Sequence, residues 1–201
     1  MKKRLGLILL LPAISFATVS NGPYVGLEVG AANQIVTFNG GTQFNNGSNA
    51  YNPSIGFLGR LNLGYNTNKY NGFELGGTYN FNTEFNYPSG GSMTLNAKTL
   101  DASYLFSLPT YVDSLLVFGR VGIAYDWISG SNNGGVSGNP GADSMADVLG
   151  AGIKYNVTSK TSLRLEWLAN GLLFPVVINN GSTNTASWTN QTFMVGLNLH
   201  F

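Results

Sequence analysis

Hydrophobic positions along most of the chain alternate with polar or small ones, which is the period of a β-strand. Within residues 54–65, large apolar side chains such as Ile55 and Phe57 fall on one face, whereas Arg60 and Asn62 fall on the other. Seven further segments alternate in the same way, at residues 25–31, 73–81, 100–106, 115–127, 149–157, 163–169 and 193–201. The pattern therefore predicts eight strands.

The links between these segments alternate in length. Four are long, at residues 36–53, 83–93, 128–144 and 171–188, and three are short, at residues 66–71, 107–114 and 158–161. One face of each strand is mostly large and apolar, and the other is mostly glycine, asparagine and charge. Long outer loops, short periplasmic turns and an even number of strands are typical of outer-membrane barrels.

The composition indicates what the apolar face meets. Only 9% of the residues are charged, against about a quarter in an average soluble domain. The apolar face is too large for one core, so we expect it to face lipid, where a closed barrel satisfies every backbone hydrogen bond. The predicted fold class is all-β, an eight-stranded antiparallel transmembrane up-and-down β-barrel.

The first 17 residues have the layout of a secretory signal peptide. Lys2, Lys3 and Arg4 precede a short apolar run, and Ser15 and Ala17 are the small residues that a signal peptidase reads. The run is too short to span a bilayer, which takes about 20 residues. We expect cleavage after Ala17, a barrel domain over residues 18–201, and export to the bacterial outer membrane of a Gram-negative cell envelope.

Several classes of chemistry are excluded by what the sequence lacks. There is no cysteine and one histidine, which rules out disulfide scaffolds, thiolate metal sites and multi-histidine metal sites. We expect neither a metal nor another cofactor. The net charge of +1 leaves no basic footprint for nucleic acid.

Two stretches of the sequence resemble a known family. Residues 150–158 followed by 162–167, together with the opening Gly22-Pro23-Tyr24-Val25-Gly26-Leu27, resemble strands of the OmpA/OmpX-type small outer-membrane barrels. The chain end resembles the assembly signal of that superfamily, which is carried by Phe193, Val195, Leu197, Leu199 and Phe201. The resemblance implies insertion by the barrel-assembly machinery and contact with outer-membrane lipid and lipopolysaccharide. We expect no periplasmic peptidoglycan-binding domain after the barrel, so we do not carry over that anchoring role.

The candidate site consists of charged residues at the strand positions that we expect to face the barrel interior. Neighbouring strands offer Glu28 with Arg60, Asp101 with Arg120, and Lys154 with Glu166. An eight-stranded barrel is only wide enough for side chains, so we expect a charge network that closes the lumen. Its members are Glu28, Arg60, Glu74, Asp101, Arg120, Lys154, Arg164 and Glu166.

Catalytic constellations are weak in this sequence. A serine hydrolase needs a histidine beside a serine, and we expect His200 to be a polar residue at the periplasmic rim with serines far away. Asp126, Asp143 and Asp147 cluster at the outer rim, where solvated loop carboxylates are the more frequent explanation. We therefore expect no catalytic residues.

Most of the residues in three of the four long links are uncharged. Residues 37–54, 128–142 and 171–191 contain no charged side chain, so binding of polyanions there is not expected. Asn, Ser, Thr and Gly with a few aromatic anchors suit adaptable recognition. The candidate loop contacts with a host or surface ligand are Phe38, Phe44, Tyr51 and Trp188. The sequence names no ligand, and hydrated loops without a partner are the simpler interpretation.

Three functions are compatible with this pattern. The first is a non-enzymatic structural or surface-interaction, adhesin-like protein that presents loops on a barrel with a charge-plugged lumen. The second is a narrow, porin-like passive pore for small solutes. The third, an enzyme acting on outer-membrane lipid, is disfavoured by the position of His200.

Overall fold

The computed structural model describes residues 21–38, 43–44, 55–86, 92–133, 141–179 and 185–201. Within these residues the chain forms ten strands and no helix, so no described helix is long and apolar enough to cross a membrane. The strands are β1 (Gly22–Phe38), β2 (Gln43–Phe44), β3 (Gly56–Asn66), β4 (Asn71–Asn86), β5 (Ser92–Pro109), β6 (Leu115–Asn133), β7 (Gly141–Asn156), β8 (Thr161–Asn170), β9 (Val176–Asn179) and β10 (Thr185–His200).

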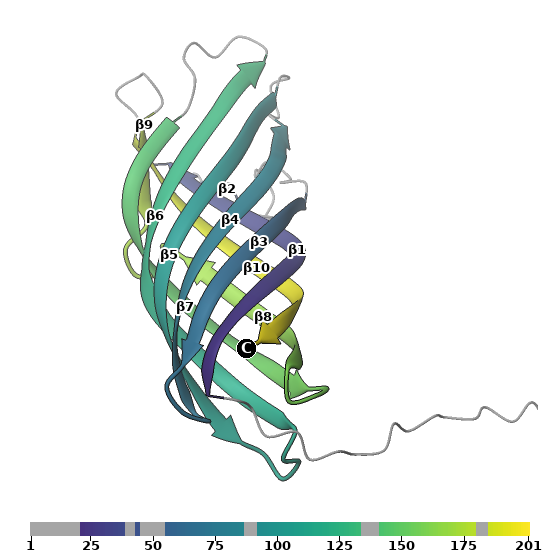
Figure 1. Cartoon of the computed structure of the whole chain (residues 1–201). Helices are drawn as coiled ribbons and strands as arrows, with labels where there is room; N and C mark the ends of the chain where they lie inside the picture. Colours follow the sequence, from purple (N-terminus) through teal and green to yellow (C-terminus); the bar gives the residue numbers. More distant parts are fainter. Residues whose placement is uncertain (1–20, 39–42, 45–54, 87–91, 134–140, 180–184) are drawn as a thin grey trace, which may run out of the picture.

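Eight of these strands close into an antiparallel barrel (Figure 1). Each pairs with its neighbour along the chain, and β1 closes the ring by pairing with β10 from Tyr24 and His200 to Phe38 and Ala186. The short β2 pairs with β1 beyond the end of β3, and β9 pairs with β10 beyond the end of β8. The predicted eight-stranded barrel is confirmed, with strands longer than the alternation alone indicated. The end with the short links 67–70, 110–114 and 157–160 is called the turn end, and the opposite end the loop end.

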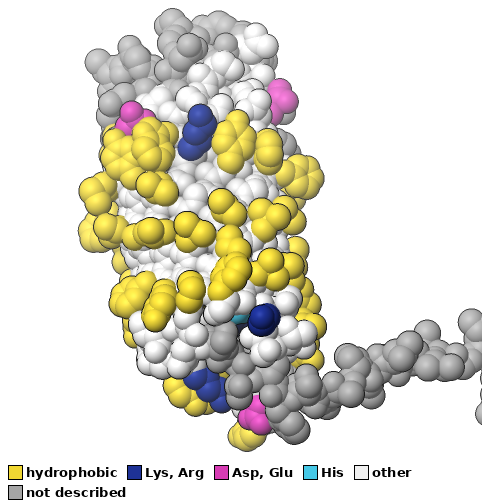
Figure 2. Space-filling model, in the orientation of Figure 1, with side chains coloured by type: hydrophobic (Ala, Val, Ile, Leu, Met, Phe, Trp, Pro, Cys, Tyr) yellow, Lys and Arg dark blue, Asp and Glu magenta, His cyan; other side chains and the backbone are white. Residues whose placement is uncertain are grey.

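The outward face is a belt of apolar side chains, because it must meet hydrocarbon. Leu63, Leu75, Ile123 and Leu165 are each 56–58% exposed, and Figure 2 shows the hydrophobic side chains in bands around the wall. Aromatic residues bound the aliphatic band on both sides, as in transmembrane barrels. Exposed rings towards the turn end are Tyr65, Phe73, Tyr104 and Phe106, and towards the loop end Phe57, Tyr79, Phe81, Tyr125 and Trp127.

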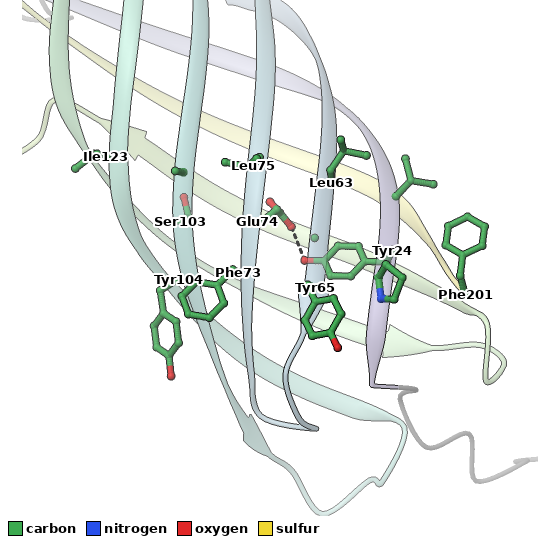
Figure 3. Close-up of a pocket in the computed structure, with 14 residues that line it drawn as sticks. Tyr24, Leu63, Tyr65, Phe73, Glu74, Leu75, Ser103, Tyr104, Ile123 and Phe201 are labelled. Carbon is green, nitrogen blue, oxygen red and sulfur yellow. Dashed lines mark hydrogen bonds between the residues drawn. The ribbon is translucent and has the colours of Figure 1, made fainter.

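A shallow groove of about 800 Å³ runs along this belt near the turn end. Leu63, Leu75 and Ile123 line one side, and the rings of Phe73 and Tyr104 line the other (Figure 3). The groove opens outward, so it is part of the lipid-facing surface.

The lumen is polar near the turn end and apolar near the loop end. The expectation that the inner face is mostly glycine, asparagine and charge is therefore wrong near the loop end. There the lumen holds a buried apolar cluster made by Val36, Phe85, Met93, Leu95, Ala97, Ile128, Ala146, Val176, Ile178 and Trp188. A second cluster lies next to it on the side of the turn end, made by Ala32, Leu58, Ala124, Val148, Leu168 and Met194.

The outer face changes polarity at the same level. Asn82 and Ser129 are exposed on the outside of β4 and β6 beyond Phe81 and Trp127, and Lys98 of β5 is exposed between the rings of Tyr79 and Trp127, which it faces in the two ladders. A wall that has left the hydrocarbon meets water, so apolar side chains turn inward and polar ones outward, as in a soluble barrel. A bulge in β4 between Asn80 and Thr83 shifts the alternation by one residue and brings Phe85 into the lumen.

Candidate functional site: the luminal ion-pair network

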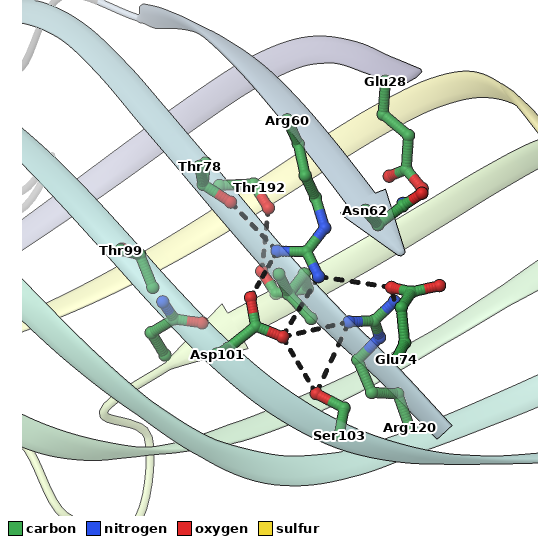
Figure 4. A network of polar contacts seen from close by, with 12 residues as sticks. Glu28, Arg60, Asn62, Glu74, Thr78, Thr99, Asp101, Ser103, Arg120 and Thr192 are labelled. Atoms are coloured by element: carbon green, nitrogen blue, oxygen red, sulfur yellow. Dashed lines mark hydrogen bonds and ion pairs between the residues drawn. The ribbon is translucent and has the colours of Figure 1, made fainter. Parts of the chain in front are cut away.

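Seven charged side chains from six strands meet in the lumen towards the turn end, and Figure 4 shows five of them, Glu28, Arg60, Glu74, Asp101 and Arg120. Their direction follows from strand parity, because every second residue of a barrel strand points inward. Every side chain in the ion pairs is at most 2% exposed. The members are Glu28 on β1, Arg60 on β3, Glu74 on β4, Asp101 on β5, Arg120 on β6, and Arg164 and Glu166 on β8.

Glu74 contacts all three arginines. Its Oε1 lies 3.3 Å from Nη2 of Arg60 and also contacts Nη2 of Arg120. Its Oε2 accepts hydrogen bonds from Nη1 of Arg164 and from the hydroxyl of Tyr24, both at 2.7 Å. A buried carboxylate is costly unless its oxygens are paired, and here both oxygens are.

Asp101 joins two of the same arginines from the other side. It accepts two hydrogen bonds from Arg60, at 2.5 and 3.0 Å, which is the bidentate geometry that a guanidinium favours. Arg120 Nη1 lies 3.3 Å from Oδ1 of Asp101, and Ser103 donates to the same oxygen at 3.0 Å. Asp101 and Glu74 therefore tie Arg60 and Arg120 into one cluster.

Two acids complete the network at β8 and β1. Glu166 lies 2.8 Å from Nε of Arg120 and 2.7 Å from Nη2 of Arg164. Glu28 lies 3.5 Å from Nη1 of Arg164 and accepts a hydrogen bond from Nδ2 of Asn62 at 2.6 Å. The ion pairs thus run across the lumen from β1 and β3 to β8.

Two of the three predicted pairings differ in the structure. Asp101 does contact Arg120. Glu28 faces Arg60 in the β1–β3 ladder, yet the Arg60 guanidinium extends to Asp101 and leaves Glu28 to Arg164.

Lys154 was predicted to join the network, but the structure does not include it among the ion pairs. It is half-buried and makes no ion pair within the described part of the chain. It stands opposite Arg164 in the β7–β8 ladder, where like charges repel. The oxygens of Glu166, its predicted partner, contact Arg120 and Arg164 instead.

The lumen below the network is almost filled. A cavity lined by Tyr24, Asn66, Lys154, Arg164 and other residues has a volume of only about 10 Å³, roughly the space of one water molecule. Polar side chains therefore crowd the lumen around this cavity.

A second buried polar group was missed by the sequence interpretation. Asp126 is fully buried in the lumen, where it accepts hydrogen bonds from Thr99 and from Nδ2 of Asn170. Its inward direction was readable, because it lies six residues after Arg120 on the same strand and therefore on the same face. The expectation of a solvated loop carboxylate is wrong for Asp126, which lies within β6.

The other two aspartates of that expected outer cluster are also separated. Asp143 is exposed on the outside of β7. Asp147 is 8% exposed, and its Oδ1 accepts hydrogen bonds from backbone N–H groups at residues 173 and 174. No group of three or more His, Cys, Asp or Glu able to hold a metal occurs in the described residues.

His200 lies at the turn end with its ring inside the barrel. Its Nε2 lies 3.1 Å from Oγ of Ser162 and its Nδ1 lies 3.5 Å from Nδ2 of Asn66. The expectation that serines are far from His200 is therefore wrong, because closure of β10 against β8 pairs Asn198 with Ser162. Ser162 is fully buried and His200 is 5% exposed, so the pair presents almost no accessible surface.

The expected loop contacts have different positions. Trp188 is fully buried within β10, and its Nε1 donates to Oε1 of Gln34 at 3.1 Å. Its assignment as a loop anchor is corrected, because the strand continues above the aromatic rings and its inner face is apolar there. Phe38 ends β1, Phe44 belongs to β2, and Tyr51 lies outside the described residues, as does the expected signal peptide at residues 1–17.

The residues of the resembled assembly signal follow β10 to its end. Phe193, Val195, Leu197 and Leu199 face outward, and Phe201 is 74% exposed with its backbone N–H donating to the carbonyl of Pro23. The last strand thus presents an apolar ridge next to β1, where the barrel closes.

Comparison with solved structures finds the same architecture. Neisserial surface protein A is similar over 90% of this chain and 97% of its own, at 16% identity and a TM-score of 0.60. OprG of Pseudomonas aeruginosa is similar over 93% of this chain and 100% of its own, at 11% identity and a TM-score of 0.61. The Ail protein of Yersinia pestis, solved with the heparin analogue sucrose octasulfate, is similar over 90% of this chain and 99% of its own, at 12% identity and a TM-score of 0.53.

These identities show a shared fold. No curated protein matches the sequence. The model of the outer membrane protein β-barrel domain matches residues 5–201, which is nearly the whole chain. The protein is therefore a small eight-stranded outer-membrane barrel, and it belongs to the outer membrane protein β-barrel domain family.

Proposed function

We propose that this protein is a closed, non-enzymatic barrel that presents uncharged loops at the cell surface in a structural or surface-interaction role. The observation that carries the proposal is the network of three arginines and four acids across the lumen. Removing a partner from a buried ion pair typically costs about 3–5 kcal/mol, so opening a path through these pairs is unfavourable. The burial of Ser162 and His200 supports a barrel without enzymatic activity.

The loop composition supports the outward-facing part of the proposal. Residues 37–54, 128–142 and 171–191 carry no charged side chain, although residues 128–133, 176–179 and 185–191 belong to strands. The proposed partners are outer-membrane lipid and lipopolysaccharide, the barrel-assembly machinery during insertion, and a surface ligand at the loop end. Export through a cleaved leader at residues 1–17 is part of the same proposal.

Conductance measurements test the closed lumen. The refolded wild-type protein in a planar lipid bilayer is expected to show little or no stable conductance. Arg120→Ala removes contacts to Glu74, Asp101 and Glu166 and is expected to lower stability and to allow brief, small openings. Lys154→Ala is the matched control, because it removes an inward-facing base without an ion pair.

A large, steady wild-type channel, with Arg120→Ala as stable as Lys154→Ala, would instead establish the narrow passive pore. Epitope insertion tests the orientation separately. An epitope after Ser137, in the long link after β6, should bind antibody on intact cells, whereas one after Ser159, in the turn before β8, should not. The reverse labelling pattern contradicts the proposed orientation.

A further inference from the structure

The barrel wall is interrupted between β8 and β9. Both strands pair with β10: Asn170 faces Asn190, and Val176 faces Trp188. Residues 171–175, here called the flap, therefore occupy a place that a regular strand would fill with one residue opposite Thr189. Gly171 has a φ of 71°, which allows the chain to turn out of the strand there.

Asp147 on β7 holds the flap. Its Oδ1 accepts hydrogen bonds from the backbone N–H of Leu173 at 3.0 Å and of Phe174 at 2.7 Å. Its carbonyl oxygen accepts one from the N–H of Gly171 at 3.0 Å. Unpaired backbone groups are costly in hydrocarbon, so these three bonds replace the interrupted ladder and fix the flap against β7.

The fixed flap lines one side of an open pocket on the outside of the barrel. The pocket has a volume of about 370 Å³ and is lined mainly by Val121, Ile123, Met145, Leu149, Leu173 and Phe174. This size lies within the usual range of about 300–1,000 Å³ for small-molecule sites. Ile123 also lines the groove of the lipid-facing belt, so the pocket is continuous with the surface that meets lipid.

The charge nearby indicates which lipid fits. Lys98 is the only basic side chain that the described residues place on the outside of the barrel at the loop end. Lys98 faces Trp127 in the β5–β6 ladder, and Trp127 faces Asp143 in the β6–β7 ladder. Asp143 is two residues before Met145, which lines the pocket. The carboxylate of Asp143 would repel an anionic head group, whereas the ammonium group of Lys98 would attract it. We therefore expect such a head group beside Lys98.

We propose that the pocket beside the flap binds one acyl chain of lipopolysaccharide, with a lipid A phosphate at Lys98. The apolar lining takes the chain, and the ammonium group of Lys98 pairs with the phosphate at the edge of the hydrocarbon. The proposal rests on the outer-membrane location and not on the closed lumen, so conductance and lipid binding fail independently.

Native mass spectrometry of the full-length barrel in detergent micelles, titrated with purified lipid A, tests the site. Leu173→Asn makes the flap side of the pocket polar and is expected to weaken lipid A binding by about tenfold, equivalent to about 1.4 kcal/mol. Leu63→Asn is the matched control: Leu63 is 58% exposed and Leu173 63%, but Leu63 lines the other groove. Lys98→Gln should also weaken binding, whereas Lys69→Gln, in a turn-end link, should not.

Asp147→Ala should have the effect of Leu173→Asn, and Asp147→Asn should restore binding because its amide oxygen still accepts the flap N–H groups. If Asp147→Ala shows no heat-dependent shift in gel migration and is therefore unfolded, the comparison of Leu173→Asn with Leu63→Asn alone tests the site. Equal weakening by Leu173→Asn and Leu63→Asn, or no weakening by either, would overturn the site in favour of ordinary lipid contact. Equally tight binding of dimyristoyl phosphatidylethanolamine would overturn the choice of lipopolysaccharide.

Discussion

The guanidinium of Arg60 occupies the space that a side chain at residue 76 would need. A Cβ placed on Gly76 would lie 1.9 Å from Nη2 and 2.3 Å from Cζ of Arg60. Gly76 faces the lumen, and because it has no side chain the Arg60 side chain can cross over it and reach Asp101. The same relation recurs at Gly64, where a Cβ would lie 2.0 Å from the ring of Tyr24.

Gly76→Ala is therefore expected to destabilise the barrel by about 1–3 kcal/mol, the usual cost of overpacking a filled interior. Gly77→Ala is the matched control, because Gly77 faces outward and a Cβ there meets nothing within 4 Å. Urea unfolding in lipid vesicles measures both. Equal stabilities of the two variants would contradict the tight packing of Arg60 against Gly76.

Lysine substitutions in the belt should be costly. Leu75→Lys and Leu165→Lys each place a charge in the middle of the lipid-facing belt and are expected to cost about 2–4 kcal/mol. Thr94→Lys, on the outer wall above the aromatic rings, is expected to cost about 0–1 kcal/mol. Equal unfolding free energies for the two depths would show that the bilayer boundary lies elsewhere.

Tryptophan fluorescence distinguishes the two faces of the wall. In single-tryptophan variants, lipids with brominated chains should quench Trp127, which is 40% exposed on the belt. The same lipids should leave Trp188 nearly unquenched, because it is fully buried beside Gln34 in the lumen. Strong quenching of Trp188 would mean that its ring points outward.

Deletion of Phe201 is expected to lower the amount of folded barrel in the outer membrane. The deletion removes the last apolar side chain of the resembled assembly signal and the hydrogen bond from Phe201 to the carbonyl of Pro23. Semi-native gels of isolated membranes measure the folded fraction. Phe201→Tyr, which keeps an aromatic ring at the end, is the control, and wild-type levels in the deletion would refute the assignment.

The sequence was sufficient to predict the architecture and the direction of most side chains. Strand alternation is a local property, so the inward parity of Arg60, Glu74 and Arg120 could be read directly from the chain. The low content of charge then left lipid as the only suitable surroundings for the other face. The parity of Asp126 was equally available, but its position near a predicted loop concealed it.

The partners within the lumen were decided by the tertiary structure. Which acid meets Arg164, and how Ser162 comes to His200, depends on the stagger with which β1, β8 and β10 close, and no local pattern encodes that stagger. The β4 bulge shifted the alternation that carries Phe85 inward, and the flap interrupted the ladder beside Asp147. The sequence by itself determined which face each side chain takes, because a strand repeats every two residues. Only closure of the barrel decided which side chains meet, because long charged side chains reach across several strands to whichever partner the stagger brings near.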